Sequence, residues 1–247
     1  MIYLKSSFNK PLLSIVIPAF NEENSIGECL KSIQSQDFNL PFEIIVIDGP
    51  SSDNTSLIAK RYGARVYKLR ERGINIAWLT GVEKSRAELI VFTEADTSVP
   101  RNWLRKIYEN FLLNPKAVGI VGRYKFKNKS ILNHFVLPMM LFADVFHYLW
   151  TGYYAFRGTN FAVRKKFLIK CGNFDKDIKT HGDVELSKRI SRFGKIVYLP
   201  DLNAETSNRN FKTLGNFIKF LIRLFRAVYY IEIVQKPKKI SKMFDIR

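Results

Sequence analysis

The 247-residue chain has only two cysteines and three histidines. Cys29 and Cys171 are far apart in the sequence, so they indicate neither a disulfide framework nor a metal knuckle, and a reducing compartment is expected. His134, His147 and His181 lack the spacing of metal ligands and are assigned no role.

The sequence also lacks a long apolar run after its first charged residues, an internal repeat and a low-complexity linker. No signal peptide is therefore predicted, and a cytoplasmic protein is expected. The length and the 47% hydrophobic content allow a sizeable core, which favours one main domain with elaborations.

Acidic residues are scarce beside basic ones, since 22 Asp and Glu face 40 Lys and Arg, for a formal net charge of +18. Such a charge favours nucleic acid, phosphorylated substrates or anionic lipid as partners. A nucleic-acid-binding module is the alternative that charge alone suggests. The aromatic residues show no recognisable single-strand platform motif, and the acidic loops described next would repel phosphates without a metal.

The first half alternates short β-branched runs with amphipathic stretches, which is typical of βαβ units in a parallel sheet. The predicted fold class is therefore α/β, with helices on both faces of the sheet. Strands are expected at 13–18, 43–48, 65–69, 89–93 and 117–122, and helices at 24–36, 54–62, 74–84 and 102–113. Ligands of such sheets bind beyond the carboxyl ends of the strands.

Polar residues follow the first two predicted strands at that edge. Asn21 and Glu22 follow the first strand, where they could face a ligand or only cap the next helix. Asp48 ends the second strand, where a carboxylate can accept hydrogen bonds from a nucleobase imide or a ribose hydroxyl. The alternative for Asp48 is a simple turn, because Gly, Pro, Ser, Asp and Asn around it are all turn residues.

Glu94 and Asp96 follow the apolar strand LIVF and leave the sheet together. Two carboxylates at this spacing are suited to holding a hard divalent cation, Mg²⁺ or Mn²⁺, against a diphosphate. An acidic pair in a loop can also be merely solvated. One acidic loop at the end of a strand is common by chance, but three of them at the ends of successive strands are not.

Through PAFNEE, DGPSSDNT and EADTSVP, the chain resembles the inverting family 2 glycosyltransferases of the GT-A fold, including polyprenyl-phosphate sugar synthases. The resemblance covers roughly residues 12–210, with GINIAWLTGVEKSRAELIVFTEAD similar to the donor-loop helix. It implies a nucleotide-diphosphate sugar as donor and a divalent metal. The implied donor-binding residues are Pro18, Ala19, Asn21, Glu22, Asp48, Glu94, Ala95, Asp96, Arg123 and Arg209.

Two departures from the family pattern affect these assignments. The usual Asp-x-Asp metal motif appears as Glu94-x-Asp96, and the usual paired Asp after the second strand appears as Asp48-Gly49. The resemblance implies Asp96 as the direct metal ligand. Glu94 is the second metal candidate, and it could instead reach the ribose or act through water. Arg123 resembles a donor phosphate contact, and Arg209 lies where the family has a late flexible loop.

The segment FRGTNFAVRKKFLIKCGNFDKDIKTHGDVELSKRI resembles the acceptor half of the family, with Gly158, Thr159 and Asn160 near the reaction centre. GDVEL aligns Asp183 with the general base, which takes the acceptor's proton during an inverting attack. The alternatives are N-capping of a helix at 184–193 by Asp183 and Glu185 as the base. An acceptor that is already an ionised phosphate needs no base.

Two apolar stretches bear on membrane contact. In 214–234, Lys219, Arg223 and Arg226 recur at helical spacing, which favours an interfacial helix over a membrane span, with KPKK meeting anionic headgroups. Packing on the catalytic domain or on a second subunit is the alternative. The run 131–150, interrupted by Pro138 and Asp144, is expected to form one or two short helices at the acceptor entrance.

These observations predict an inverting glycosyltransferase at the cytoplasmic face of the cell membrane, acting on a polyprenyl phosphate or a lipid-linked glycan. The alternatives are a transferase with a soluble or polymeric acceptor and a non-catalytic nucleotide-sugar-binding protein. The expected organisation is an N-terminal extension (1–10), a catalytic domain (11–210) and a basic tail (211–247). Within the catalytic domain we expect a donor half (11–123), an insertion (129–152) and an acceptor half (153–210).

Overall fold

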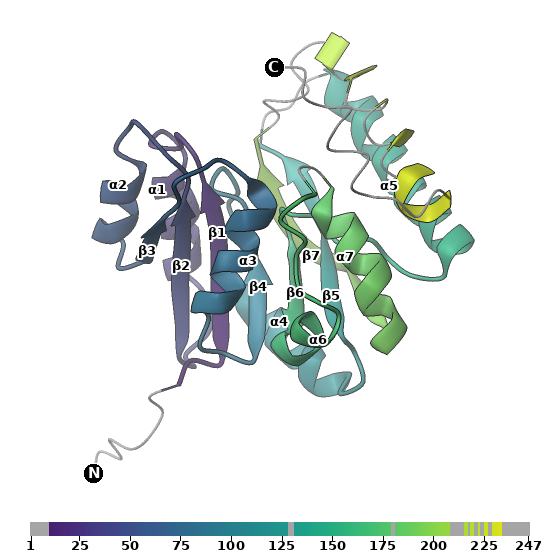
Figure 1. Ribbon diagram of the computed structural model, residues 1–247, viewed down its shortest axis with the longest axis horizontal. Helices are drawn as coiled ribbons and strands as arrows, with labels where there is room; N and C mark the ends of the chain where they lie inside the picture. The colour runs from purple at the N-terminus through teal and green to yellow at the C-terminus, as the bar shows by residue number, and fades with distance from the viewer. Residues whose placement is uncertain are drawn as a thin grey trace.

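A seven-stranded sheet forms the centre of the computed structural model, in the order β3-β2-β1-β4-β6-β5-β7 (Figure 1). The structure describes residues 10–127, 131–178, 181–207, 215–216, 218–219, 222, 225–226 and 229–233. The strands are β1 (Leu13–Ala19), β2 (Phe42–Asp48), β3 (Arg65–Lys68), β4 (Leu89–Phe92), β5 (Gly119–Phe126), β6 (Phe161–Arg164) and β7 (Ile196–Thr206). All neighbouring pairs are parallel except those of β6, which runs antiparallel to β4 and β5.

The central strands are buried on both faces, which explains their nearly continuous apolar sequences. Every residue of β1 and of β4 is buried, as expected for parallel strands covered by helices on both sides. Ser14 is the polar exception in β1, and its hydroxyl donates a 2.7 Å hydrogen bond to the buried Glu43 carboxylate. The predicted α/β class with a mostly parallel sheet is confirmed.

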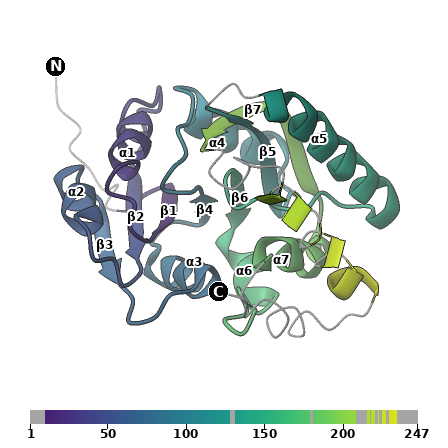
Figure 2. The same cartoon turned by 90° about the horizontal axis from the view of Figure 1, so that it is seen from above.

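Two helical layers cover the sheet (Figure 2). One apolar core joins the sheet to α1 (Ile26–Gln34), α2 (Thr55–Arg61) and α4 (Trp103–Leu113). A second joins the opposite face to α3 (Ile74–Lys84), α6 (Lys165–Lys170) and α7 (Gly182–Ile190), which the 3₁₀ turn Ser191–Phe193 follows. The five strands and four helices predicted in the first half are all present, with ends within a few residues. The domain boundaries stay predictions.

The stretch expected to form one or two short helices is instead a single helix, α5 (Ile131–Thr151), which contains Pro138. A proline removes one backbone hydrogen bond and need not end a helix that tertiary packing supports. Here Val136 and Met140 are buried against Tyr124 and Phe126 of β5. In the described part of the chain, no helix has both the length and the hydropathy needed to cross a membrane.

The C-terminal segment returns to the body of the protein through a turn of π-helix at Tyr229–Ile233. Ile231 is buried against Val184 of α7, and Glu232 accepts hydrogen bonds from the Tyr153 hydroxyl and the Lys188 ammonium. The Glu232 carboxyl is partly buried, which raises its pKa, but its hydrogen bonds with His147, Tyr153 and Lys188 outweigh burial and lower the pKa to about 2. Glu232 therefore stays anionic and anchors this segment to α7.

Candidate active site

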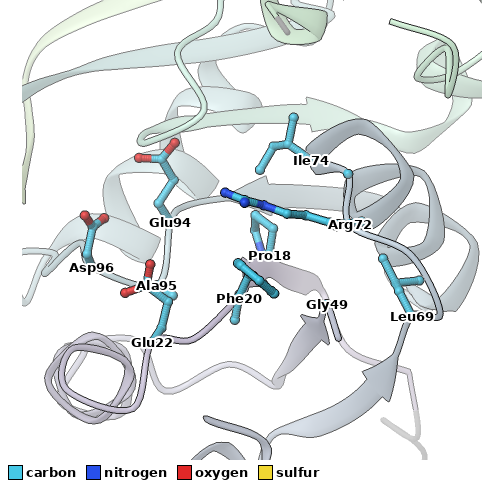
Figure 3. A pocket seen from close by; sticks show the side chains of 13 residues that line it. Pro18, Phe20, Glu22, Gly49, Leu69, Arg72, Ile74, Glu94, Ala95 and Asp96 are labelled. Atoms are coloured by element: carbon cyan, nitrogen blue, oxygen red, sulfur yellow. The ribbon is translucent and has the colours of Figure 1, made fainter. Parts of the chain in front are cut away.

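A cavity of about 270 Å³ opens at the carboxyl ends of β1, β2 and β4 (Figure 3). The strands are parallel and in register, so their following loops meet at one edge, where the sequence predicted a ligand site. Its lining comprises Pro18, Ala19, Phe20, Glu22, Gly49, Leu69, Arg72, Gly73, Ile74, Ala77, Glu94, Ala95 and Asp96. Six of the ten residues predicted to bind a donor lie here: Pro18, Ala19, Glu22, Glu94, Ala95 and Asp96.

Glu94 and Asp96 are held by hydroxyl groups from the acceptor half of the chain. The Thr159 hydroxyl donates to Glu94 at 3.1 Å, and the Thr206 hydroxyl donates to Asp96 Oδ1 at 3.3 Å. The loop is fixed further because the Thr93 hydroxyl donates to the Thr159 carbonyl at 2.9 Å. The two carboxylates therefore occupy defined positions between the two halves of the molecule.

A second cavity, of about 230 Å³, shares Glu94 and Asp96 with the first. It is lined on its other side by Gly158, Thr159 and Asp183, together with Tyr124, Phe126, Met140, Arg157, His181, Val184, Thr206 and Ser207. Residues from the predicted donor and acceptor regions thus line two adjoining cavities that share one pair of carboxylates.

Asp183 faces this second cavity with its carboxylate fixed by two backbone groups. Its Oδ2 accepts the Gly158 N–H at 2.9 Å and its Oδ1 accepts the Val184 N–H at 3.0 Å. Helix α7 begins at Gly182 and its N-cap is His181, in a left-handed conformation with φ of 57°, so Asp183 is not the N-cap. The side chain is thus available to the cavity.

Glu185, the alternative base, does not reach either cavity. It is buried, and Arg189 binds its two carboxylate oxygens at 2.6 Å each. Burial lowers the pKa of Arg189, but the hydrogen bond and charge of Glu185 outweigh it, so the pKa is raised. This ion pair is structural, and Asp183 is the carboxylate that lines the second cavity.

Asp48 lies beneath the first cavity and does not face it. Its side chain is fully buried, and its two oxygens accept hydrogen bonds from the hydroxyls of Ser51 and Ser56. Gly49 occupies the cavity wall instead, where an added Cβ would lie 3.2 Å from the Phe20 ring. In this structure Asp48 therefore shapes the β2 loop, and its contact with a nucleoside stays a prediction.

Two other predicted contacts line neither cavity, and a third cannot be placed. Asn160 is fully buried, where its amide binds the carbonyls of Arg123 and Leu202 and the Trp103 indole, so it supports the sheet rather than an acceptor. Asn21 follows β1 and contacts the loop after β2: its backbone N–H donates to the Ser51 hydroxyl, and its side-chain oxygen accepts the Ser52 N–H. It lines neither cavity. Arg209 lies outside the described residues.

Arg123 was predicted to contact the donor phosphates, but it does not line the cavity with Asp96. A register shift between Gly122 and Arg123 in the β5–β7 pairing changes the course of the strand at this position. Arg123 instead lines a small cavity against α5 with Arg157 and Asp144.

Gly158 and Thr159, the predicted acceptor residues, do line the second cavity. Gly158 lies so close to its neighbours that an added Cβ would be 2.9 Å from the Trp78 ring and 3.1 Å from Glu94. A larger residue would push the Glu94 carboxylate away. The close approach of this backbone therefore explains a glycine here.

The sequence did not single out Arg72, although it points into the first cavity. It follows β3 in the loop LRERG, and its guanidinium carbon lies 4.5 Å from the centre of the Phe20 ring. Figure 3 shows its side chain reaching across the cavity toward the side that carries Glu94. The only available signal was its place after the third strand, at the same sheet edge.

Replacing Arg72 with alanine is expected to weaken the binding of a nucleoside diphosphate by about tenfold, because one charge-assisted hydrogen bond contributes about 1.5–3 kcal/mol. Calorimetric titration with UDP and GDP in the presence of Mn²⁺ measures the change. Arg70→Ala is the matched control, since Arg70 is exposed and does not line the cavity. Equal affinities of the two variants would exclude a phosphate contact.

A divalent cation fits the oxygen chemistry of Glu94 and Asp96. Among the described residues, no three His, Cys, Asp or Glu side chains gather as a complete metal site. In nucleotide enzymes Mg²⁺ is commonly bound by one or two carboxylates together with the substrate phosphates. The expectation is therefore a cation held jointly by protein and ligand.

The chain is similar to several known proteins. The model of the family described as Glycosyl transferase family 2 matches residues 14–172. The chain is similar to the probable glycosyltransferase YdaM of Bacillus subtilis, with 26% identity over 74% of this chain and 47% of that protein. It is also similar to 4,4'-diaponeurosporenoate glycosyltransferase of Staphylococcus aureus, with 35% identity over 44% of this chain and 29% of that protein.

Among solved structures, a mannosyltransferase from Pyrobaculum calidifontis in complex with GDP-Man and Mn²⁺ has a similar fold. It aligns with a TM-score of 0.67 and 18% identity, over 96% of this chain and 74% of that one. This chain spans about half the length, or less, of the curated relatives it matches.

Proposed function

Because the chain belongs to glycosyl transferase family 2, we propose that it transfers a sugar from a nucleoside diphosphate sugar to an acceptor hydroxyl, with inversion at the anomeric carbon. The observation that carries the proposal is that Glu94 and Asp96 line both cavities. A leaving diphosphate bound on one side of this pair and an acceptor bound on the other place the sugar between them. This arrangement suits an in-line displacement.

In this proposal, Asp96 and Glu94 hold the divalent cation together with the diphosphate. When bound, the cation offsets the negative charge that develops on the departing nucleotide. Arg72 adds a second positive charge to the same cavity, above the Phe20 ring. The nucleoside then lies along the wall formed by Gly49 and Leu69.

Asp183 accepts the proton of the acceptor hydroxyl as its oxygen forms the new bond to the anomeric carbon. The Gly158 and Val184 N–H groups fix the orientation of the carboxylate, which is the preorganisation that general base catalysis needs. The C–O bond to the diphosphate breaks on the opposite face of the sugar. The proton ends on Asp183 and the electron pair leaves with the nucleotide.

A panel of nucleotide sugars tests this function. With Mn²⁺ present, at least one UDP-, GDP- or dTDP-linked sugar is expected to raise the melting temperature, since a ligand at 100 times its Kd stabilises a protein by about 2.7 kcal/mol. The same sugar is expected to have little effect in EDTA. Absence of any metal-dependent shift across the panel would contradict the proposal, and binding without sugar release to any acceptor would indicate a non-catalytic protein.

We further propose that the acceptor is a membrane lipid and that the protein binds the cytoplasmic face of the membrane peripherally. An apolar stripe supports this, formed on α5 by Phe142, Val145, Phe146 and Leu149, which are 52–76% exposed at helical spacing. Exposed apolar residues of the C-terminal segment, Ile218, Ile222 and Phe225, accompany the exposed cations Lys219 and Arg226. Such a mixture suits the boundary between acyl chains and anionic headgroups.

One relative named for a carotenoid acid, 4,4'-diaponeurosporenoate, is consistent with an apolar acceptor. The double substitution Phe142→Ser and Phe146→Ser is expected to weaken binding to anionic liposomes by roughly tenfold or more, because each phenyl ring contributes about 1.5–3 kcal/mol when buried. Co-sedimentation measures the binding. Leu112→Ser with Leu113→Ser is the matched control, since these residues are 63% and 77% exposed at the end of α4. Equal losses in both double variants would contradict docking through α5.

A further inference from the structure

Two arginines lie between β5 and α5 with more donor groups than the described residues satisfy. Arg157 and Arg123 line one small cavity there, together with Asp144 of α5 and the rings of Tyr124, Tyr154 and Tyr198. The Nε groups of both arginines are buried, and neither has a hydrogen-bond partner among the described residues. Burying an N–H donor without a partner is unfavourable, so an acceptor bound beside these groups would be stabilised.

A carboxylate pairs with one of the two guanidinium groups. Arg157 donates to Asp144, whose side chain is 27% exposed, while that of Arg157 is 16% exposed. Burial lowers the pKa of Arg157, but the neighbouring Asp144 charge outweighs it, so the pKa is raised and the side chain stays cationic. Burial raises the pKa of Tyr124, which stays a neutral phenol. Arg157 and Arg123 bring two positive charges to this cluster, and the negative charges of Asp144 and Asp183 act on Arg157.

Arg157 connects this cluster to the acceptor site. It lines both the small cavity and the larger one that contains Asp183 and Gly158. A guanidinium binds an oxyanion with two parallel hydrogen bonds, which makes it more selective for phosphate or carboxylate than a point charge. It can therefore hold an anionic group of an acceptor whose hydroxyl lies at Asp183.

We propose that Arg157, supported by Arg123, binds an oxyanion carried by the acceptor, a phosphate or a carboxylate that is distinct from the attacking hydroxyl. The inference rests on the proposed transferase function, because it assigns the oxyanion to the acceptor of that reaction. Binding of the oxyanion can be measured without turnover. The apolar stripe on the outer face of α5 suits a lipid chain attached to that oxyanion. A single lipid could then place its anionic headgroup on the inner face of α5 and its acyl or isoprenoid chain on the outer face of the same helix.

Titration of the full chain with four probes tests the proposal: a short isoprenyl monophosphate, the same chain ending in a carboxylate, the same chain ending in a hydroxyl, and inorganic phosphate. The anionic isoprenoids are expected to bind roughly tenfold or more tighter than the alcohol, which is the effect of a charged hydrogen bond. Inorganic phosphate that binds as tightly as the isoprenyl phosphate supports the site and assigns it to free anions. Weaker binding of inorganic phosphate supports a lipid headgroup.

The variants make the assignment specific. Arg157→Gln is expected to remove the preference for the anionic probes, and Asp144→Asn to strengthen it, because the competing carboxylate is gone. In Arg157→Gln the partly buried Asp144 loses its ion-pair partner, which could destabilise the fold. The double variant Arg157→Gln with Asp144→Asn removes this charge and controls for that effect. Arg192→Gln, at an exposed arginine outside both cavities, is the control that keeps the preference.

Equal binding of the alcohol and the phosphate, or an unchanged preference in the double variant, would overturn the inference. Metal-dependent binding of nucleotide sugars is measured on the same preparations. Its absence in the unsubstituted protein contradicts the proposed function, while its presence without oxyanion selectivity contradicts this inference alone.

Discussion

Replacing Asp96 with alanine is expected to abolish the metal-dependent part of donor binding and to lower sugar transfer by on the order of 10²–10³. The side chain faces both cavities and is one of two carboxylates suited to the cation. Metal stabilisation of a leaving diphosphate contributes several kcal/mol, and each 1.36 kcal/mol of barrier is a factor of ten. Titration with UDP or GDP, in Mn²⁺ and in EDTA, separates the metal-dependent part.

The control for this experiment is Asp201→Ala, at an exposed carboxylate on β7 that pairs with Lys106. It removes the same charge from the chain without touching either cavity, and its donor affinity is expected to stay unchanged. If Asp96→Ala retains the full Mn²⁺ dependence, Asp96 is not a metal ligand and the proposed arrangement of the leaving group is wrong.

Asparagine at position 183 is expected to leave donor binding within about twofold and to reduce transfer by about 10²–10⁴, the usual contribution of a positioned general base. The amide is nearly isosteric and can still accept the Gly158 N–H through its oxygen, but it cannot take a proton. Separate measurement of donor affinity and of turnover gives both numbers. The loss is expected in turnover.

Glu185→Gln serves as the comparison on the same helix. Because Glu185 is bound to Arg189 and lines neither cavity, this variant is expected to lose about 2–3 kcal/mol of stability, with little change in turnover of the folded protein. Near-normal transfer by Asp183→Asn would show that Asp183 is not the base. An acceptor that attacks as an ionised phosphate would give that result.

The parts of the site that sequence reasoning found are those fixed by chain order. Glu22, Glu94 and Asp96 follow strands of a parallel sheet, so the topology alone brings them to one edge. The apolar pattern of the strands was enough to predict that topology in the first half. The position of β6 between β4 and β5 was not predictable in this way, because local pattern does not encode strand order.

The predicted site residues that do not line the first cavity are placed by contacts between distant residues. Asp48 turns inward because the hydroxyls of Ser51 and Ser56 satisfy its carboxylate. Arg123 lies against α5 after the register shift at Gly122, which no spacing in the sequence reveals. Arg72 was not predicted, because the sequence LRERG does not show that Arg72 rather than Arg70 points into the cavity.

The central claim is that Asp96 and a nucleoside diphosphate jointly hold one cation at the junction of the two cavities. Anomalous scattering from crystals of the protein soaked with Mn²⁺ and UDP or GDP tests it most directly. The account predicts a single manganese peak about 2.1 Å from an Asp96 oxygen, with diphosphate density on the side of Arg72 and none of this in Asp96→Ala. A manganese peak on other residues, or a diphosphate bound outside this cavity, would contradict it.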